Sequence, residues 1–325
     1  ARMGRRRPRI HPRGSSGAAV WRLSREGRMT SDVVTVAFAV GYLGDSFHGS
    51  QVQPDVRTVQ GDLQSALSAR GITSAESARI RMSSRTDAGV HARMNVGCCE
   101  LPAAVWADMG EDGFIRMMND GLDESVVWSA TAVEPGWNPR PALRRTYRYR
   151  LEALRGWNSK TSEEELSSVL SLFIGEHDFT AFARIEEGRS PLRCVESCQP
   201  WSEAGRLVGF EIAAESFLWN QVRRIAWAVV RVLAGDLSAT SVSESLAAGE
   251  ARTDLGVASA RWLTLWSIEH AEVSFASEAV EASDLLSAPP EDADERALRM
   301  WQATAEMEQK LLLRRCWMQA LSRRR

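Results

Sequence analysis

Apolar positions after residue 32 form two successive series of strand-length and helix-length segments. In the first series, the apolar pattern predicts strands at 33–40, 78–82, 94–101 and 126–133 and helices at 58–70 and 111–120. The order β-α-β-β-α-β is that of the split unit of ferredoxin-like domains, in which helices cover one face of an antiparallel sheet. This part of the chain is therefore predicted to be an α+β half.

A similar series follows the turn-rich residues 135–141. Apolar periodicity there predicts strands at 145–153, 194–201, 207–214 and 262–270 and helices at 162–173 and 218–233. Ser162 and the three glutamates after it mark the start of the first of these helices. We therefore predict two ferredoxin-like βαββαβ-type halves, residues 29–140 and 141–270, whose antiparallel sheets flank a central catalytic cleft.

The two ends of the chain differ from these halves. Residues 1–28 contain nine arginines, one acid and several prolines and glycines, which is typical of a disordered basic tail. Met29, just before the first strand, is a candidate natural start, although an Arg-rich leader is also typical of an organellar transit peptide. Residues 271–325 are predicted to be a helical extension, because 297–320 has a helical pattern.

Composition excludes some classes of protein and leaves others open. No apolar run approaches the roughly 20 residues of a membrane helix, so no membrane partner is predicted. The five cysteines form an odd set without metal-type spacing, so we expect reduced thiols in a cytoplasmic protein and no bound metal. The net charge is −2 although residues 1–28 are strongly basic, so the remainder is acidic. Such a body would have to gather arginines on one face to bind nucleic acid.

The run Arg-Thr-Asp-Ala-Gly-Val-His-Ala at 85–92 is the most informative for chemistry. It lies between two predicted strands, and Gly89 permits a sharp reversal that projects Asp87 outward. Arg85, two residues earlier, can point the same way. The alternative is that Asp87 only stabilises an Asx-turn. His91 is expected to shape the loop rather than to transfer protons.

Arg223 and Arg224 lie early in an otherwise apolar helical segment. If Arg223 meets Asp87 inside a cleft, the pair would favour the charged carboxylate. Removing Arg223 would then leave an unpaired buried charge, at about 3 to 5 kcal/mol. The alternative places both arginines on the solvent face of the helix. A further basic run is either a phosphate track or a solvated face, and it consists of Arg144, Arg145, Arg148 and Arg150.

Together these runs resemble the tRNA pseudouridine synthase A family over about residues 33–270. The run 85–92 is similar to the catalytic loop of the family, and 145–149 to its aromatic strand. Gln51 and Gln53 are similar to its early Gln-x-Gln signature, and Thr58, Val59 and Gln60 to its helix-start signature. Its later helix motif is similar to Phe217, Leu218, Val222 and Arg223. The chain departs from the pattern at Trp227, Ser259, Trp262 and His270, where glycine, proline, glycine and tyrosine are common. These departures alter packing near the cleft rather than the chemical groups.

The resemblance implies an activity and a set of site residues. It assigns Asp87 as the catalytic aspartate and Tyr147 as the aromatic ring that stacks on the target base. Arg223 would be the ion-pair partner of Asp87, and Arg85 would hold the nucleotide out of the stem. The implied reaction is isomerisation of uridine to pseudouridine in the anticodon stem-loop of tRNA, at about positions 38–40, where a base must leave its stack. It implies no cofactor, tRNA as partner and a homodimer.

Asp87 would act as nucleophile at C1′ or as base at C2′, and Tyr147 is a candidate acceptor of the C5 proton. Two other functions remain open. A catalytically inactive RNA-binding protein would keep Arg85 and Tyr147 but would not need Asp87 to face Arg223. A nucleoside or glycoside hydrolase would need a second carboxylate about 5 to 9.5 Å from the first, and none stands out in these motifs. Residues 271–325 lie beyond the resemblance and either dock on the body or contact RNA.

Overall fold

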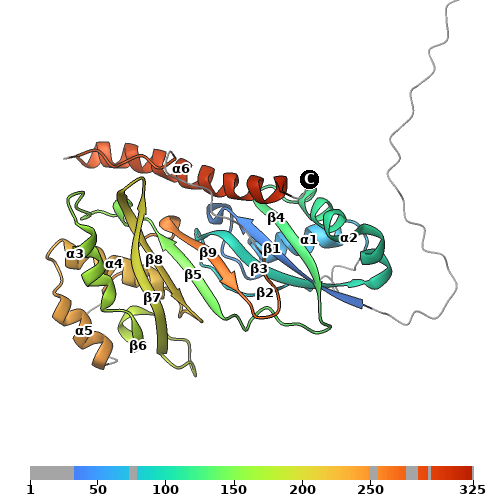
Figure 1. Cartoon of the computed structure of the whole chain (residues 1–325), viewed down its shortest axis with the longest axis horizontal. Helices are drawn as coiled ribbons and strands as arrows, with labels where there is room; N and C mark the ends of the chain where they lie inside the picture. The colour runs from blue at the N-terminus through green and yellow to red at the C-terminus, as the bar shows by residue number, and fades with distance from the viewer. Residues whose placement is uncertain (1–32, 73–78, 249–254, 276–284, 292–293, 324–325) are drawn as a thin grey trace, which may run out of the picture. The chain divides into compact units, whose positions relative to one another are not determined.

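The computed structural model describes residues 33–72, 79–248, 255–275, 285–291 and 294–323. The predicted tail at 1–28 lies outside them. The strands are β1 (Val33–Tyr42), β2 (Arg81–Met82), β3 (His91–Pro102), β4 (Ser125–Val133), β5 (Arg144–Tyr149), β6 (Gly175–Asp178), β7 (Leu192–Glu203), β8 (Arg206–Ala214) and β9 (Leu263–Glu269). Within the described residues they form one nine-stranded sheet of order β4-β1-β3-β9-β5-β8-β7-β6, with β2 paired to β3 (Figure 1).

The α+β class is confirmed, but the strands of the two series form one sheet instead of two separate sheets. β3 and β9 pair in parallel at His91↔Thr264 and Ala92↔Leu265, whereas the other pairings among the described strands are antiparallel. β9 also pairs with β5, so it has a hydrogen-bonded neighbour on each side. The join follows directly after the loop that carries Asp87.

Helices surround this sheet. The α-helices are α1 (Val59–Ser68), α2 (Ala103–Asn119), α3 (Glu163–Ser171), α4 (Gln221–Leu233), α5 (Ala239–Ala248) and α6 (Glu295–Ser322), and the short 3-10 helices are η1 (Gly44–Ser46), η2 (Leu151–Ala153), η3 (Thr180–Phe182) and η4 (Ala260–Trp262). Ser162 caps α3 as predicted, since its hydroxyl accepts the N–H of Glu165 and the Glu165 carboxylate accepts the N–H of Ser162. In the described part of the chain, every helix is too short or too polar to span a membrane.

Several boundaries differ from the predictions for local backbone reasons. α4 begins three residues later than predicted because Asn220 has a φ of 64°, which a right-handed helix does not accommodate. α2 begins at Ala103 instead of 111, because a kink at Gly110 (φ 59°) breaks the helical period. The strand predicted at 145–153 ends at Tyr149, and η2 follows. β6 and α5 were not predicted from the pattern, and β6 has only four residues.

β1 is the centre of the core in the first half. It is buried from Thr35 to Tyr42, so both of its faces are covered. Phe38 packs on Phe114 of α2, with ring centroids 5.8 Å apart. A Cβ at Gly41 would lie 1.9 Å from the Trp317 indole nitrogen of α6, so glycine is needed for this helix to approach the strand. The predicted C-terminal helix therefore docks on the sheet.

Arg145, Arg148 and Arg150 of the basic run do not form a track or a solvated face, whereas Arg144 is half-exposed and pairs with Glu196. Arg150 is completely buried, and its Nε donates to Glu152 Oε1 at 2.7 Å. Its Nη1 donates to the carbonyl of Ala305 in α6 at 2.8 Å. Arg145 is 8% exposed and donates to backbone carbonyls, and Arg148 binds Glu211 at 2.8 Å. The sequence hypothesis fails for these three arginines because the fold brings distant groups, among them the Ala305 carbonyl and the Glu211 carboxylate, within hydrogen-bond distance of them.

Candidate functional site

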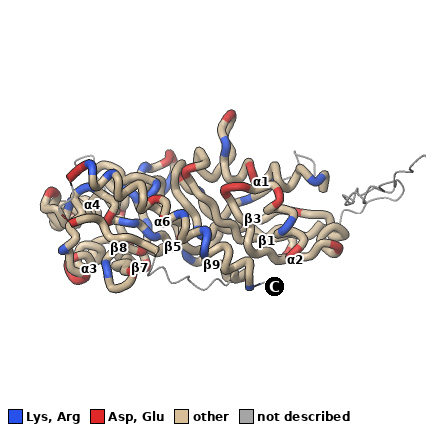
Figure 2. The backbone as a smooth tube through the Cα atoms, turned by 90° about the horizontal axis from the view of Figure 1, so that it is seen from above, with Lys and Arg blue, Asp and Glu red and all other residues tan. Residues whose placement is uncertain are grey.

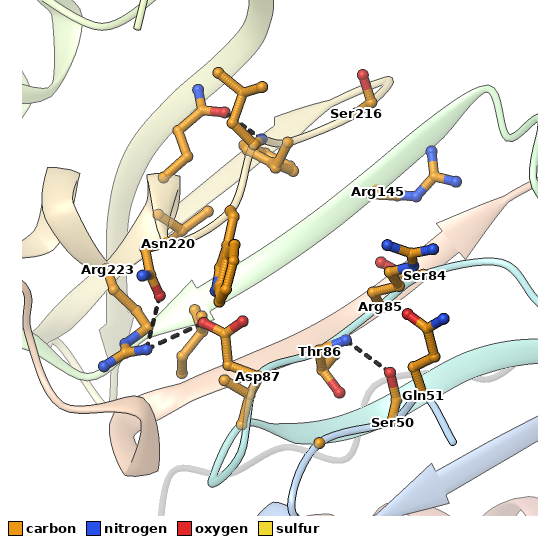
Figure 3. Close-up of a pocket in the computed structure, with 18 of the residues that line it drawn as sticks. Ser50, Gln51, Ser84, Arg85, Thr86, Asp87, Arg145, Ser216, Asn220 and Arg223 are labelled. Carbon is orange, nitrogen blue, oxygen red and sulfur yellow. Dashed lines mark hydrogen bonds and ion pairs between the residues drawn. The ribbon is translucent and has the colours of Figure 1, made fainter. Parts of the chain in front are cut away.

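The loop that carries Asp87 is held by backbone hydrogen bonds on both sides (Figure 3). The Thr86 N–H donates to Ser50 Oγ at 2.8 Å, and the Ser50 N–H donates to the carbonyl of Thr86 at 3.0 Å. The turn closes with the Val90 N–H donating to the Asp87 carbonyl at 3.1 Å. Gly89 has a φ of 84°, a conformation that favours glycine. The reversal predicted from Gly89 is therefore present, and it directs the Asp87 side chain into a pocket.

A buried polar network lies beneath this loop. Asn95 in β3 accepts the N–H of Ser84 and donates to the Ser84 carbonyl, so its side chain fixes the loop backbone. The same amide donates to the Tyr42 hydroxyl at 3.1 Å, and Tyr42 bonds Thr86 Oγ1 at 2.8 Å. A fully satisfied buried network of this kind rigidifies the backbone that it contacts.

His91 supports the loop from below, where its side chain is completely buried. Its Nδ1 accepts the N–H of Gly44 at 3.1 Å, a role that requires the neutral ring in this tautomer. Burial lowers the pKa of His91 from its usual 6.5 to about 4. The charge of Asp45 partly raises this pKa, and the charge of Lys310 lowers it further. His91 is thus a structural base that stays uncharged at neutral pH.

This depressed pKa predicts an acid-linked loss of stability. Because the unfolded chain binds the His91 proton at higher pH than the folded chain, the contribution is complete above pH 6.5 and is lost as pH falls towards about 4. The expected loss is about 3 kcal/mol of unfolding free energy. Urea unfolding at pH 7.5 and pH 4.5 measures it. His91→Gln, whose amide oxygen can accept the Gly44 N–H, should show a smaller difference, and an unchanged difference would contradict the assignment.

Asp87 forms an ion pair with Arg223 of α4, 136 residues away in the chain (Figure 3). Arg223 Nη1 lies 3.0 Å from Asp87 Oδ2 and also donates to Asn220 Oδ1 at 2.9 Å. Its Nε donates to the carbonyl of Ala258 at 2.8 Å. The left-handed backbone of Asn220 places its amide beside the guanidinium. Of the two arrangements considered from sequence, the structure shows the ion pair, and the solvent-facing arrangement is wrong for Arg223.

Tyr147 of β5 lines the same pocket and is 6% exposed. Its hydroxyl bonds Ser84 Oγ at 3.1 Å, and its ring meets Phe217 edge-on with centroids 5.3 Å apart. Burial raises the pKa of Tyr147 above its usual value, and this outweighs the lowering by the Ser84 hydrogen bond and the Arg145 charge, so the neutral phenol is favoured. A neutral phenol can stack and donate a hydrogen bond, but it is a weak proton acceptor.

The pocket has a volume of about 760 Å³ and a strongly basic lining. Seven arginines line it, against the two acids Asp87 and Glu186: Arg85, Arg140, Arg145, Arg184, Arg189, Arg193 and Arg223. Elsewhere, basic and acidic positions are interspersed along the elements (Figure 2). Arg85 is exposed, and its Nη1 lies 3.9 Å from Glu186. The chain as a whole carries a net charge of −2, but this cavity is suited to a polyanion.

All four residues chosen from sequence, Asp87, Arg85, Tyr147 and Arg223, therefore line one pocket. Sequence reasoning missed Asn220, which orients Arg223, and Trp219 beside it. It also missed three lining arginines at 184, 189 and 193, although their recurrence in a segment between predicted elements was a usable signal. No sequence signal marked Asn220, because its role depends on its left-handed conformation.

The sequence of this chain is similar to those of known proteins. A family model described as tRNA pseudouridine synthase matches residues 169–270. A tRNA pseudouridine synthase A from Pyrococcus furiosus is 35% identical over 245 residues, 74% of this chain and 85% of the relative. Relatives of the same name from Methanopyrus kandleri and Streptomyces griseus are 36% and 31% identical, covering 74% and 79% of this chain and 88% and 95% of themselves. This chain belongs to the tRNA pseudouridine synthase A family.

Proposed function

We propose that this protein isomerises uridine to pseudouridine in tRNA, with Asp87 as the catalytic carboxylate. The observation that carries the proposal is the Asp87–Arg223 ion pair inside an arginine-lined pocket. Family membership supports the reaction and the tRNA substrate. The site combines residues from both predicted halves, 29–140 and 141–270.

The reaction suits a single carboxylate. The C1′–N1 bond of uridine breaks, the uracil turns and C1′ joins C5. The C5 proton then leaves to water and N1 takes up a proton from water, so the net change is an isomerisation. In one route an Asp87 oxygen bonds C1′ as N1 departs with the electron pair, and C5 then displaces the carboxylate. In the other, Asp87 removes the C2′ proton so that N1 departs, and the proton returns after C5 has bonded C1′. Both routes need an ionised carboxylate and a uracil held close until it recombines.

Each neighbour of Asp87 has a distinct role in this proposal. Arg223, fixed by Asn220 and the Ala258 carbonyl, orients the carboxylate through the ion pair. Tyr147 stacks on the target base as a neutral phenol. Arg85, exposed at the pocket mouth, fills the space that the target base leaves in its stack. Arg140 and Arg189, which are exposed in the pocket lining, neutralise phosphates of the RNA.

The target base must leave its stack before C1′ can approach Asp87, which costs a few kcal/mol. We propose the anticodon stem-loop as the target, at about positions 38–40, where a stem meets an open loop and unstacking is less costly. The family resemblance is the basis for this location. A homodimer and a cytoplasmic location remain predictions, and light scattering of the purified chain measures the first.

Nucleoside analysis after incubation with unmodified tRNA separates the candidate functions. The proposal predicts that pseudouridine appears as uridine disappears, without free uracil. Free uracil would indicate a hydrolase. Tight tRNA binding with no change in nucleosides would indicate a catalytically inactive RNA-binding protein. Either of these last two results would overturn the proposal.

Replacing Arg223 with methionine should lower kcat/KM for tRNA by about 10- to 100-fold, or about 1 to 3 kcal/mol. This expected effect is smaller than the cost of about 3 to 5 kcal/mol predicted from sequence for an unpaired buried charge. The Arg223 and Asp87 side chains are 17% and 28% exposed, so water replaces part of the lost interaction. Arg231→Met, on the same helix but outside the pocket, is the matched control and should keep wild-type activity. A rate for Arg223→Met equal to that of the control would remove Arg223 from the mechanism.

A further inference from the structure

Trp219 is unusual among the tryptophans that the structure describes. It is 42% exposed, and it is the one aromatic residue among the exposed large hydrophobic side chains of the described residues. The other described tryptophans are buried or half-buried. Exposing an indole to water forgoes its burial energy, so a solvent-facing indole inside a pocket is typical of a binding residue.

The backbone at Trp219 is fixed rather than loosely placed. The Arg184 N–H donates to the Trp219 carbonyl at 2.8 Å, forming an isolated β-bridge between two loops. On one side, the Leu218 N–H donates to Gln221 Oε1 at 2.8 Å. On the other, Asn220 adopts its left-handed conformation and binds Arg223. The indole is therefore tied to the same structural unit that positions the partner of Asp87.

The Arg184 guanidinium packs on the Trp219 ring, with its Cζ 4.2 Å from the ring centroid. Both residues line the pocket that contains Asp87. Aromatic rings and guanidinium planes both stack on nucleobases, and this stacking tolerates any base because each base has a π-face. Together they form a stacking surface with a positive charge built into it.

We propose that Trp219 and Arg184 form a second base-stacking subsite, which holds a nucleobase adjoining the target uridine. The inference rests on the proposed function. Tyr147 is assigned to the target itself, and it lies on a different element, β5, bonded to Ser84. When the target leaves its stack, each neighbouring base loses a stacking partner; Arg85 in the vacated space covers one neighbour, and the indole stacks on the other. The subsite therefore acts in tRNA binding and not in bond cleavage.

Trp219→Ala should weaken tRNA binding and raise KM by about 10-fold while kcat changes little. Trp219→Phe, which keeps a π-face, should recover most of the affinity. Leu192→Ala is the control, because Leu192 is also exposed at 51% but lies outside the pocket. Melting temperatures should match for all three variants. Unchanged KM and Kd in Trp219→Ala, or a fall confined to kcat, would overturn the subsite.

A second test removes the stacked nucleobase from the RNA instead of the Trp219 indole from the protein. Transcripts with an abasic nucleotide on either side of the target uridine are titrated against wild type and Trp219→Ala. One abasic position should weaken wild-type binding by about 10-fold and leave the variant unaffected, because the two changes remove the same contact. Equal losses in both proteins would overturn the inference. Failure of the wild type to form pseudouridine on the intact transcript would instead overturn the proposed function, so the two failures are distinguishable.

Discussion

Asp87→Asn should lower the rate of pseudouridine formation by about 10³-fold or more, because it removes a group that acts directly on the ribose. The amide keeps the size of the carboxylate and its oxygen can still accept from Arg223, so the loop should keep its fold. Transcripts carrying tritium at C5 of uridine report the step directly, since the C5 hydrogen is released when C1′ joins C5. Tritium release is followed with enzyme in excess, so that product release does not limit the rate.

Glu186→Gln is the matched control for this experiment. It makes the same change of acid to amide in the same pocket, but Glu186 is an exposed side chain that pairs only loosely with Arg85, at 3.9 Å, and with Arg189, at 3.7 Å. Its effect should lie within about 2-fold, as expected for a weak surface pair. Gel-shift affinities for tRNA should remain similar for both variants. Equal losses in the two variants would mean that the pocket responds to charge in general and that Asp87 has no special role.

Arg150→Met should lower the free energy of unfolding by about 3 to 5 kcal/mol, the usual effect of removing one partner from a buried ion pair. Arg150 is completely buried and bonds the equally buried Glu152 as well as the Ala305 carbonyl of α6. Methionine fills much of the space but satisfies none of these groups. Arg206 also binds Glu152, so the negative charge of Glu152 keeps one cationic partner in the variant. Urea unfolding monitored by circular dichroism measures the change.

Arg155→Met provides the comparison. Arg155 also pairs with α6, through Glu295 at 3.4 Å, but the two side chains are 83% and 68% exposed. The expected change is below about 1 kcal/mol, because exposed pairs are screened by water and salt. If Arg150→Met is no more destabilising than Arg155→Met, the Arg150 network does not hold α6 in place.

Local sequence patterns predicted those parts of the fold whose cause is local. Ser162 with its glutamates predicted the start of α3, because a capping box depends on four adjacent residues. The strands predicted at 194–201 and 207–214 are present as β7 and β8, joined by a short turn in which Ala204 and Gly205 both have positive φ. The parallel join of β3 to β9 was not predicted, because it brings together residues more than 170 positions apart. Apolar periodicity gives no information on such pairings.

The functional site shows the same division between features with a local cause and features that depend on distant contacts. The sequence singled out Asp87 and Arg223, but their contact depends on where α4 begins, and Asn220 sets that point through its left-handed backbone. Arg145 and Arg150 were open between two surface roles, but both are buried, and their partners include the carbonyls of Ser83 and Ala305, which are distant in the chain. Arg184 and Trp219 were not selected as a pair, since they come into contact only when the fold brings two loops together.

The most direct test of the central claim maps the product in RNA. Wild type, Asp87→Asn and Glu186→Gln are each incubated with unmodified tRNA transcripts, and pseudouridine is located by carbodiimide treatment and primer extension. The account predicts stops in the anticodon arm for wild type and Glu186→Gln, and none for Asp87→Asn. The same stops in the Asp87→Asn sample, at the same time points, would contradict it.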